Sequence, residues 1–479
     1  MTGFAEYDNY DGLGLAELVR SGEVCAGDLL EEAIARNERV NGELNAVVHT
    51  FYDQARVAIE AGLPEGPFQG VPFLLKDLHL AMRGTTTSNG SGMWRDQIAD
   101  HDSTLVQRYR QAGLVTFGKT NSPELGLMPV TEPKAFGPSR NPWDTDKTPG
   151  GSSGGSGAAV AAGIVPMAHA SDGGGSIRIP AACCGLVGLK PSRGRVPFGP
   201  DKAEGWAGQS TSHVVSRSVR DTAAILDATA GPEVGEAYAA PYYGGSFLKA
   251  AQSAPAALKI AVSRQKWGKG AYQSDALAGI DASVALLEDL GHQVEEARPD
   301  YDGEALASLM FTIVSVNTAL AARQRAGELG CSVDDLEMED STRFTMELGN
   351  SISAADYAEA IQMNQRAGRL LGEFHQKYDI LLAPTLSSAP VSVGYISDAP
   401  PQEYGDRLVG FMGDTGLYNQ TGQPSISLPL HWTDNNLPLG MMFTAAFGND
   451  ALLLQLAGQL EQSCPWWERR PPLHSRSDA

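Results

Sequence analysis

The sequence predicts an α/β fold, a single large domain in which helices cover both faces of a mixed, mostly parallel-like β-sheet. Two observations support this class. Hydrophobic residues make up 42% of the chain and charged residues 19%, where about 25% is usual, so a large core can be buried. Helical patterns also alternate with short apolar runs. Length alone favours about three domains, but α/β enzymes often run long as one unit, so we expect one domain over residues 1–479.

The first half of the chain contains several of these elements. Residues 26–40 have apolar side chains at helical spacing, which predicts an amphipathic helix. Residues 70–76 (GVPFLLK) form an apolar run after a Gly- and Pro-rich stretch, which predicts a buried strand. Residues 102–112 have a helical pattern that ends at Gly113, and a strand is expected to follow over 114–118.

The second half repeats the pattern. Residues 274–290 predict a helix that ends at Gly291, with a strand beginning directly after it. Residues 305–372 are rich in Ala, Met, Glu and Arg with little Pro or Gly punctuation, so we expect a mostly helical section at about 300–372 that covers the sheet. Residues 378–384 (YDILLAP) and 425–430 (SISLPL) are further core strands.

The acidic composition limits the partners. Lys and Arg number 36 and Asp and Glu 57, which gives a net charge of −21. Such a surface repels phosphate backbones and anionic lipid, so we expect neither nucleic acid nor a membrane as a partner. The chain starts MTGFAEYDNYDG, which is unlike a signal peptide, and we expect no stretch of the roughly 18 apolar residues that span a membrane. These features predict a cytoplasmic protein.

Cysteine usage argues against structural cross-links. The chain has five cysteines, an odd number, and no CxxC spacing. A disulfide framework or a structural zinc site is therefore not expected.

Two loops rich in Ser and Gly stand out. Residues 150–156 (GGSSGGS) alone would suit a flexible linker, yet they lead straight into an Ala/Val helix pattern, as an anion-binding loop does. Residues 171–178 (SDGGGSIR) lie between apolar segments, which a linker does not explain. Three consecutive glycines let successive backbone N–H groups converge on one point, so Ser176 at the end of this loop would have an oxyanion hole beside it.

A nucleophilic serine needs a base. None of the nine histidines shows a linked pattern with either loop, and His169, the nearest upstream, is better explained as a strand-end residue. Lysine serves instead where burial disfavours its charged form. Lys76 ends the apolar run 71–75 and is the best candidate, although an ordinary strand-end lysine paired with Asp77 explains the pattern equally well.

Together these segments resemble the amidase signature family. The resemblance rests on Lys76 in GVPFLLKD, Ser152 in PGGSSGGSGAAVAAG and Ser176 in SDGGGSIRIPAACCGLVGLKPSRGR, with the family's spacing of 24 positions between the two serines. It extends through GKTNSPELG, RNPWD, DILLAPT and NQTGQPSISLP, and so covers nearly the whole chain. It is weakest between about residues 240 and 370.

The resemblance implies a Ser–cisSer–Lys triad that hydrolyses a carboxamide through an acyl-enzyme, with esters or carbamates as side substrates. Ser176 would be the nucleophile, Ser152 the bridging serine and Lys76 the neutral base. The oxyanion hole would consist of backbone N–H groups, namely those of Gly173, Gly174, Gly175 and Ser176.

Supporting roles follow from the same resemblance. Ser153 would bond to Lys76, and Asp172 and Arg178 would shape the loop. No metal or organic cofactor is needed, the substrate is a small-molecule amide, and homodimers are common among similar proteins. The family often has Thr-Gly-Gly before the nucleophile where this chain has Gly173 and two further glycines, which leaves open how the loop is braced.

Other classes of function explain less of the sequence. Ser152 and Ser153 each lie at the centre of a G-x-S-x-G pattern, so an α/β-hydrolase-type esterase with either serine as nucleophile is an alternative. Such an esterase needs a histidine downstream of the serine, and the late histidines are poor candidates. His431 follows a proline-bounded strand, and His474 lies in a polar tail. A phosphate-binding loop lacks the required Gly-Lys-Ser/Thr. A non-enzymatic binding module leaves Lys76 and both loops unexplained.

Within the family, the main alternative is the glutamine-hydrolysing subunit of a tRNA-dependent amidotransferase. Such a subunit often has a polar residue where this chain has Ile179, and an apolar neighbour favours an apolar or amide substrate over free glutamine. Segments 131–143, 168–181 and 465–473 are nearer to stand-alone hydrolases, of which 6-aminohexanoate-cyclic-dimer hydrolases and aryl acylamidases look most similar. Substrate choice would then lie in the helical section at about 300–372.

Overall fold

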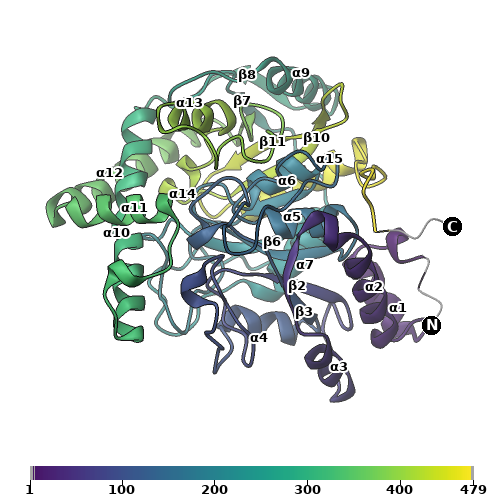
Figure 1. Ribbon diagram of the computed structural model, residues 1–479. Coiled ribbons are helices and arrows are strands. Elements are labelled where there is room, and N and C mark those ends of the chain that lie inside the picture. Colours follow the sequence, from purple (N-terminus) through teal and green to yellow (C-terminus); the bar gives the residue numbers. More distant parts are fainter. Residues whose placement is uncertain (1–3, 5, 476–479) are drawn as a thin grey trace.

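The short apolar runs of the sequence form the strands of one sheet that crosses the molecule (Figure 1). The computed structural model describes residue 4 and residues 6–475. Within these residues, eleven strands pair in the order β1-β3-β2-β4-β6-β5-β10-β11-β9-β7-β8. Along the chain they are β1 (Val47–Thr50), β2 (Pro72–Lys76), β3 (Val115–Thr120), β4 (Met167–Asp172), β5 (Val187–Lys190), β6 (Thr211–Ser216), β7 (Lys259–Val262), β8 (Gln293–Glu296), β9 (Ile380–Pro384), β10 (Ser425–Trp432) and β11 (Pro438–Ala445).

The sheet is mixed, as predicted, but antiparallel pairs are in the majority. Among the ten neighbouring strand pairs of the described chain, β2–β3, β2–β4, β7–β8 and β7–β9 are parallel and the other six are antiparallel. The expectation of a mostly parallel sheet is therefore wrong. Helix–strand alternation implies parallel pairing only where a crossover helix joins adjacent strands. Here β10 and β11 form a hairpin, and β6 lies between β4 and β5 in antiparallel register.

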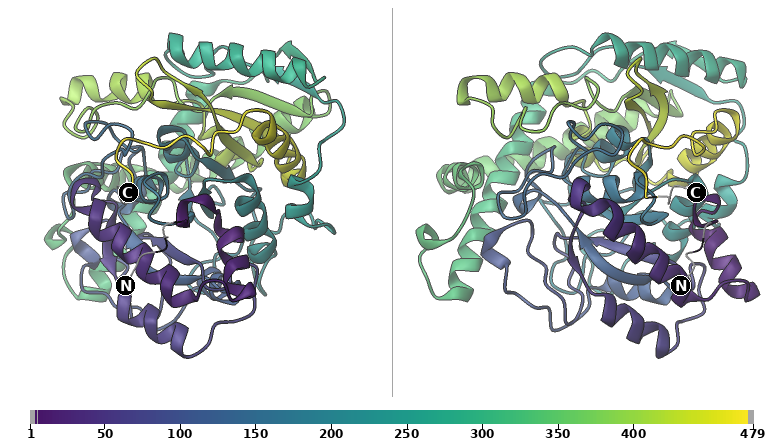
Figure 2. Two further views of the ribbon diagram at one scale, coloured as in Figure 1. Left: turned by 90° about the vertical axis from the view of Figure 1, so that its right-hand side faces the viewer. Right: turned by 45° about the vertical axis from the view of Figure 1, so that its right-hand side comes forward.

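Helices cover both faces of this sheet (Figures 1 and 2), as predicted. They are α1 (Gly12–Ser21), α2 (Ala26–Leu44), α3 (Tyr52–Glu60), α4 (Thr104–Gln111), α5 (Gly154–Ala161), α6 (Arg178–Cys184), α7 (Val219–Thr229), α8 (Phe247–Ala251), α9 (Ser274–Asp289), α10 (Gly303–Leu329), α11 (Asp340–Ser351), α12 (Ala354–Phe374), α13 (Pro401–Phe411), α14 (Leu417–Thr421) and α15 (Asp450–Ser463). Short 3₁₀ turns occur at Tyr7–Asn9, Gly92–Trp94, Glu124–Gly126 and Val333–Asp335.

Side-chain alternation along β2 decides which residues face which layer. Phe73 and Leu75 belong to a buried cluster with residues of α4 and α7, whereas Leu74 belongs to the cluster that contains the buried residues of α5. Because strand side chains alternate with a period of two, Lys76 points to the same side as Leu74. The carboxyl end of β2 thus directs a lysine toward α5.

The predicted elements correspond closely to observed ones. The helices expected at 26–40, 102–112 and 274–290 are α2, α4 and α9. The helical section expected at about 300–372 consists of α10, α11 and α12, and α10 packs against both of the others. These three helices lie together at one side of the molecule in Figure 1.

Helix α10 corrects one expectation. Its 27 residues are long and apolar enough to cross a membrane by length and composition, although no such stretch was expected. Core helices of soluble proteins meet the same criterion, so one helix of this kind is weak support for a span. In this structure α10 packs against α11 and α12, and its residues Ile313, Thr318 and Ala322 are buried.

The glycine-rich stretch 150–156 is no linker, because it leads into the completely buried helix α5. Glycine allows α5 to lie directly against neighbouring backbone. A Cβ on Gly155 would lie 2.5 Å from the backbone nitrogen of Asn121 and 2.6 Å from the carbonyl oxygen of Ala46. Neither backbone atom can move without disturbing β3 and the start of β1, so only glycine fits at this position.

We expect Gly155→Ala to lower the free energy of unfolding by about 1–3 kcal/mol, because the added methyl overpacks a rigid contact. The midpoint of urea or thermal unfolding measures the change. Gly327→Ala is the matched control, since Gly327 lies in α10 and nothing approaches its Cβ position within 4 Å. That control should be neutral or gain up to ~1 kcal/mol from helix propensity. Equal midpoints for the two variants would contradict this account of α5.

Candidate active site

Two parallel strands bring the principal polar residues to one edge of the sheet. β2 and β4 are adjacent and parallel, so their carboxyl ends meet at the same edge, where α/β proteins bind their ligands. Lys76 ends β2, and Ser171 is the next-to-last residue of β4. The loop before α5 brings Ser152 to the same place, and its peptide bond with Gly151 is cis.

Lys76 is fully buried and hydrogen-bonded to two hydroxyls. Its Nζ lies 2.7 Å from Ser152 Oγ and 3.0 Å from Ser171 Oγ, and no described carboxylate forms a salt bridge with it. Burial lowers the pKa of Lys76 to about 7, although the charge of Asp172 opposes this shift. At neutral pH a large fraction of the amine is therefore uncharged.

Asp77 is not the partner of Lys76, so the simple strand-end ion pair is wrong. The Asp77 carboxylate accepts hydrogen bonds from the backbone N–H of Ser88, at 2.8 Å, and from the Ser88 hydroxyl. His49 Nε2 lies 3.6 Å from Asp77 Oδ2. Asp77 follows Lys76 directly in the chain, but these partners hold its carboxylate away from the ammonium.

Ser171 is a site residue that the sequence analysis missed. Ser153 was expected to bond to Lys76, but its hydroxyl donates to the Ser171 carbonyl at 3.2 Å and accepts from the Ser171 N–H at 3.3 Å. The hydroxyl of Ser171 contacts the Lys76 amine instead. Ser171 opens the SDGGGS motif, which was the available signal, but the motif alone does not show which way its side chain points.

A buried ion pair shapes the loop between β4 and α6. Both side chains of the pair are completely buried, and Arg178 Nη2 and Nε donate to the two oxygens of Asp172 at 2.9 and 3.0 Å. Asp172 also accepts from the backbone N–H groups of Gly175 and Ile177 at 2.8 and 3.1 Å. Arg178 holds the pKa of Asp172 well below its usual range. Asn419 of α14 bonds to both members of the pair.

The backbone donors of this loop differ from the expected set at one position. The Gly175 N–H is used by Asp172 and is not free for a ligand. The N–H groups of Gly173, Gly174 and Ser176 make no hydrogen bond among the described residues. The loop therefore has three unpaired backbone donors at and before Ser176. The N–H of Gly175 does not belong to the expected oxyanion hole, because Asp172 occupies it.

Thr415 and Trp206 explain how the loop is built without the threonine of the family pattern. Thr415, just before α14, donates its hydroxyl to the Gly174 carbonyl at 2.6 Å and braces the loop from outside. A Cβ on Gly173 would lie 2.6 Å from the indole of Trp206, so a threonine at this position has no room. Gly175 has φ +133°, and a Cβ there would lie 2.3 Å from Thr415 Oγ1. Thr415 was not found from the sequence, because it lies more than two hundred residues from the loop that it braces.

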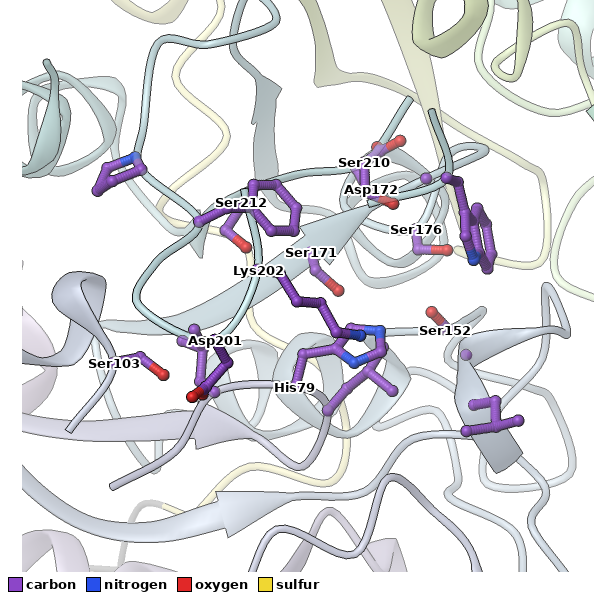
Figure 3. A pocket seen from close by; sticks show the side chains of 18 residues that line it. His79, Ser103, Ser152, Ser171, Asp172, Ser176, Asp201, Lys202, Ser210 and Ser212 are labelled. Carbon is purple, nitrogen blue, oxygen red and sulfur yellow. The ribbon is translucent and has the colours of Figure 1, made fainter. Parts of the chain in front are cut away.

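A pocket opens in front of this loop (Figure 3). The hydroxyls of Ser152, Ser171 and Ser176 face the same space in the figure, and all three residues line the pocket. No hydrogen bond joins Ser176 Oγ to Ser152 Oγ within the described chain. Apolar side chains form much of the remaining wall, and they are Leu78, Leu80, Leu125, Pro197, Phe198 and Trp206. Helices α10, α11 and α12 contribute none of the lining residues in the described structure.

Histidines near the site are unsuited to the esterase alternative. His169 Nδ1 accepts the backbone N–H of Lys76 at 3.2 Å, and burial lowers the pKa of His169 well below its usual value. In the residues that the structure covers, neither the Ser152 nor the Ser153 hydroxyl bonds to a histidine. Nor do three His, Cys, Asp or Glu side chains in that part of the chain come together as a metal site.

Comparison with known proteins finds a family match and similar solved structures. The sequence profile of the Amidase family matches residues 28–454. A 6-aminohexanoate-cyclic-dimer hydrolase from Paenarthrobacter ureafaciens is 37% identical over 477 residues, which cover 97% of this chain and 96% of that protein. A solved structure of 6-aminohexanoate cyclic dimer hydrolase has a TM-score of 0.90 at 35% identity and covers 97% of this chain and 99% of its own.

A bacterial aryl acylamidase of the amidase signature family has a similar structure. Its TM-score is 0.88 at 28% identity, with 96% of this chain and 98% of that chain covered. The profile match and the relatives together span nearly all of the sequence. The chain therefore belongs to the amidase family and is an amide hydrolase.

Proposed function

We propose that this amidase cleaves its substrate through an acyl-enzyme on Ser176, with Ser152 passing the proton to a neutral Lys76. The observation that carries the proposal is the amine of Lys76, which is buried without a carboxylate partner and lies 2.7 Å from Ser152 Oγ. Ser152 and Ser176 line the same pocket. A buried neutral amine beside a hydroxyl is the kind of base that activates a serine.

The reaction balances with these groups alone. Ser176 Oγ attacks the carbonyl carbon, its proton moves to Ser152, and the Ser152 proton moves to Lys76 Nζ. The C–N bond then breaks, and the departing amine takes a proton back by the same route. Water repeats the sequence on the acyl-enzyme and releases the carboxylic acid. The net reaction is amide plus water to acid plus amine.

The free N–H groups of Gly173, Gly174 and Ser176 would stabilise the oxyanion in both steps. Donors fixed in place before the reaction are worth several kcal/mol in a site that excludes water. The Asp172–Arg178 pair acts here as a positioning element, because Asp172 accepts a hydrogen bond from the backbone of the loop and is itself held by Arg178.

The proposed substrates are linear or cyclic carboxamides, with esters and carbamates as side substrates. The apolar pocket wall and the similarity to a cyclic-dimer hydrolase and an aryl acylamidase support this range. A panel of anilides, cyclic amides, linear ω-amino oligomers, carbamates and glutamine tests it. Glutamine hydrolysis that appears only with partner subunits would favour the amidotransferase alternative. A homodimer, a cytoplasmic location and a substrate-facing role for residues 300–372 stay predictions.

Lys76→Ala should lower kcat by at least ~10³-fold on a good amide substrate, because it removes the base and leaves the oxyanion hole. In the wild type, kcat/KM should rise as the pH increases through about 7, since only the deprotonated amine accepts a proton. Both are measured in one series of pH–rate profiles. A variant that keeps more than about a tenth of wild-type activity, a loss below ~1.4 kcal/mol, rules out Lys76 as the base.

The two hydroxyls beside Lys76 should differ in importance. Ser152→Ala is expected to lose more kcat than Ser171→Ala, because the proposed proton route passes through Ser152 and only borders Ser171. Ser152→Ala should still lose less than Lys76→Ala, since a water molecule can replace the hydroxyl at a worse angle. Stopped-flow or steady-state kcat values give the order. A larger loss in Ser171→Ala would place Ser171 on the proton route instead.

Phenylmethylsulfonyl fluoride should label Ser176, because the most nucleophilic hydroxyl in the pocket takes the sulfonyl group. Peptide mass spectrometry locates the label, and Lys76→Ala should label more slowly. A label found on Ser152 or Ser153 alone would instead support the esterase alternative.

A further inference from the structure

One end of the pocket carries a positive charge that the proposed mechanism does not use. Lys202 lies in the exposed segment 200–203 of the loop between β5 and β6, and its side chain extends into the pocket toward His79 (Figure 3). The loop is fastened at two points. The Gly199 carbonyl accepts from the Thr104 N–H at 2.9 Å, and the Phe198 N–H donates to Glu236 at 2.8 Å. Lys202 is thus presented by an anchored segment.

The neighbouring carboxylate of Asp201 forms no salt bridge with Lys202 in the described structure, although its charge acts on the amine. Asp201 Oδ2 lies 3.0 Å from His101 Nε2, and the other ring nitrogen of His101 lies 2.7 Å from Asp100. Hydrogen bonds to these two carboxylates raise the pKa of His101. Asp172, the other acid that lines the pocket, is fully engaged by Arg178. Lys202 itself makes no hydrogen bond or salt bridge with any residue that the structure describes.

His79 supplies a second polar group at the same end. It lines the pocket beside Lys202 in Figure 3, and its φ of +64° is rare for a residue with a side chain. The backbone N–H of His79 donates to Asn89 Oδ1 at 2.9 Å and holds this part of the backbone in place. Partial burial in the pocket and the charges of Lys202 and Lys76 lower the pKa of His79 well below its usual value, while the residue keeps an exposed surface. A neutral imidazole can donate one N–H to an anion.

The balance of charge in the pocket therefore favours an anionic ligand. Burial lowers the pKa of the Lys202 amine while Asp201 opposes the shift, which is the pattern of a cation partly removed from water. Lys202 stays exposed to solvent at the pocket, so an incoming carboxylate can reach its amine and form a charge-assisted hydrogen bond with it. The apolar walls formed by Leu78, Leu80 and Phe198 suit a hydrocarbon chain.

We propose that Lys202, assisted by His79, binds a carboxylate at the end of the substrate remote from the scissile amide. The preferred substrates would then be open-chain amides with a hydrocarbon linker and a free terminal carboxylate, ahead of cyclic or neutral amides. This inference rests on the proposed function, because it assumes that the reacting carbonyl lies at Ser176. It adds a substrate class and a binding residue to that function.

Two matched substrate pairs test the inference. One pair is the monoanilide of adipic acid and the anilide of 6-hydroxyhexanoic acid, with the charge on the acyl side. The other pair is N-hexanoyl-6-aminohexanoate and N-hexanoyl-6-aminohexanol, with the charge on the amine side. In at least one pair, wild-type kcat/KM should favour the carboxylate by about tenfold or more, the effect of one charge-assisted hydrogen bond. The preference should shrink at high salt.

Lys202→Met should abolish this preference by raising KM for the carboxylate substrate far more than KM for its neutral partner. Lys202→Arg should retain most of the preference. Lys249→Met removes an exposed lysine on α8, outside the pocket, and should change neither substrate. Dissociation constants measured with the Ser176→Ala variant give the same comparison without turnover, and thermal unfolding confirms that each variant folds.

Two results would overturn the carboxylate site. One is a wild type that shows no preference in either pair, by rate or by binding. The other is an equal effect of Lys202→Met on the charged and neutral members. If Ser176-dependent hydrolysis of the neutral amides persists in either case, the proposed function stands and only the carboxylate site is wrong. Hydrolysis that does not depend on Ser176 or Lys76 would instead reject the proposed function.

Discussion

The completely buried ion pair between Asp172 and Arg178 is the interaction on which the site depends. Removing two charges from water is costly, and the cost is offset only where every charged atom has a hydrogen-bond partner. Here the pair bonds to backbone N–H groups of its own loop and to Asn419 of α14. Strand β4, the loop, the start of α6 and a helix distant in sequence are thus held as one unit. Loss of one partner of such a pair costs roughly 3–5 kcal/mol.

Lys76 shows the opposite outcome of the same burial. It has no carboxylate partner, so the low-dielectric surroundings lower its pKa to about 7 instead of preserving its charge. The two hydroxyls beside it can accept from the ammonium or donate to the amine, and therefore tolerate both protonation states. Lys76 and Arg178 are both buried beside the same loop. Their chemistry differs because only Arg178 has a carboxylate partner. One is structural, and the other suits proton transfer near neutral pH.

The glycine loop shows how a departure from a family pattern is accommodated. Gly173 stands where a threonine is common, and the ring of Trp206 takes the space that a side chain would need. Thr415 supplies a hydroxyl from another part of the chain and bonds to the Gly174 carbonyl. The N–H groups of Gly173, Gly174 and Ser176 are unpaired among the described residues, and the Trp206 ring lines the pocket.

The sequence by itself determined the class of fold and most element positions, and it predicted the site residues that the structure brings together at one edge of the sheet. Local patterns were sufficient there, because helix periodicity, apolar runs and glycine loops are encoded by residues close together in the chain. The strands at 70–76 and 425–430 and the helix at 26–40 all lie within a few residues of their predicted bounds. The motifs around Lys76, Ser152 and Ser176 were recognised for the same reason.

Only the tertiary structure decided how these elements pair and which side chains meet. The antiparallel majority of the sheet depends on which strands become neighbours, and local patterns contain no information on that. The contact of Ser171 with Lys76, the engagement of the Gly175 N–H by Asp172 and the brace from Thr415 all depend on side-chain direction or on contacts between distant segments. Free energies of burial and hydrogen bonding act between residues that are close in space, whatever their separation along the chain.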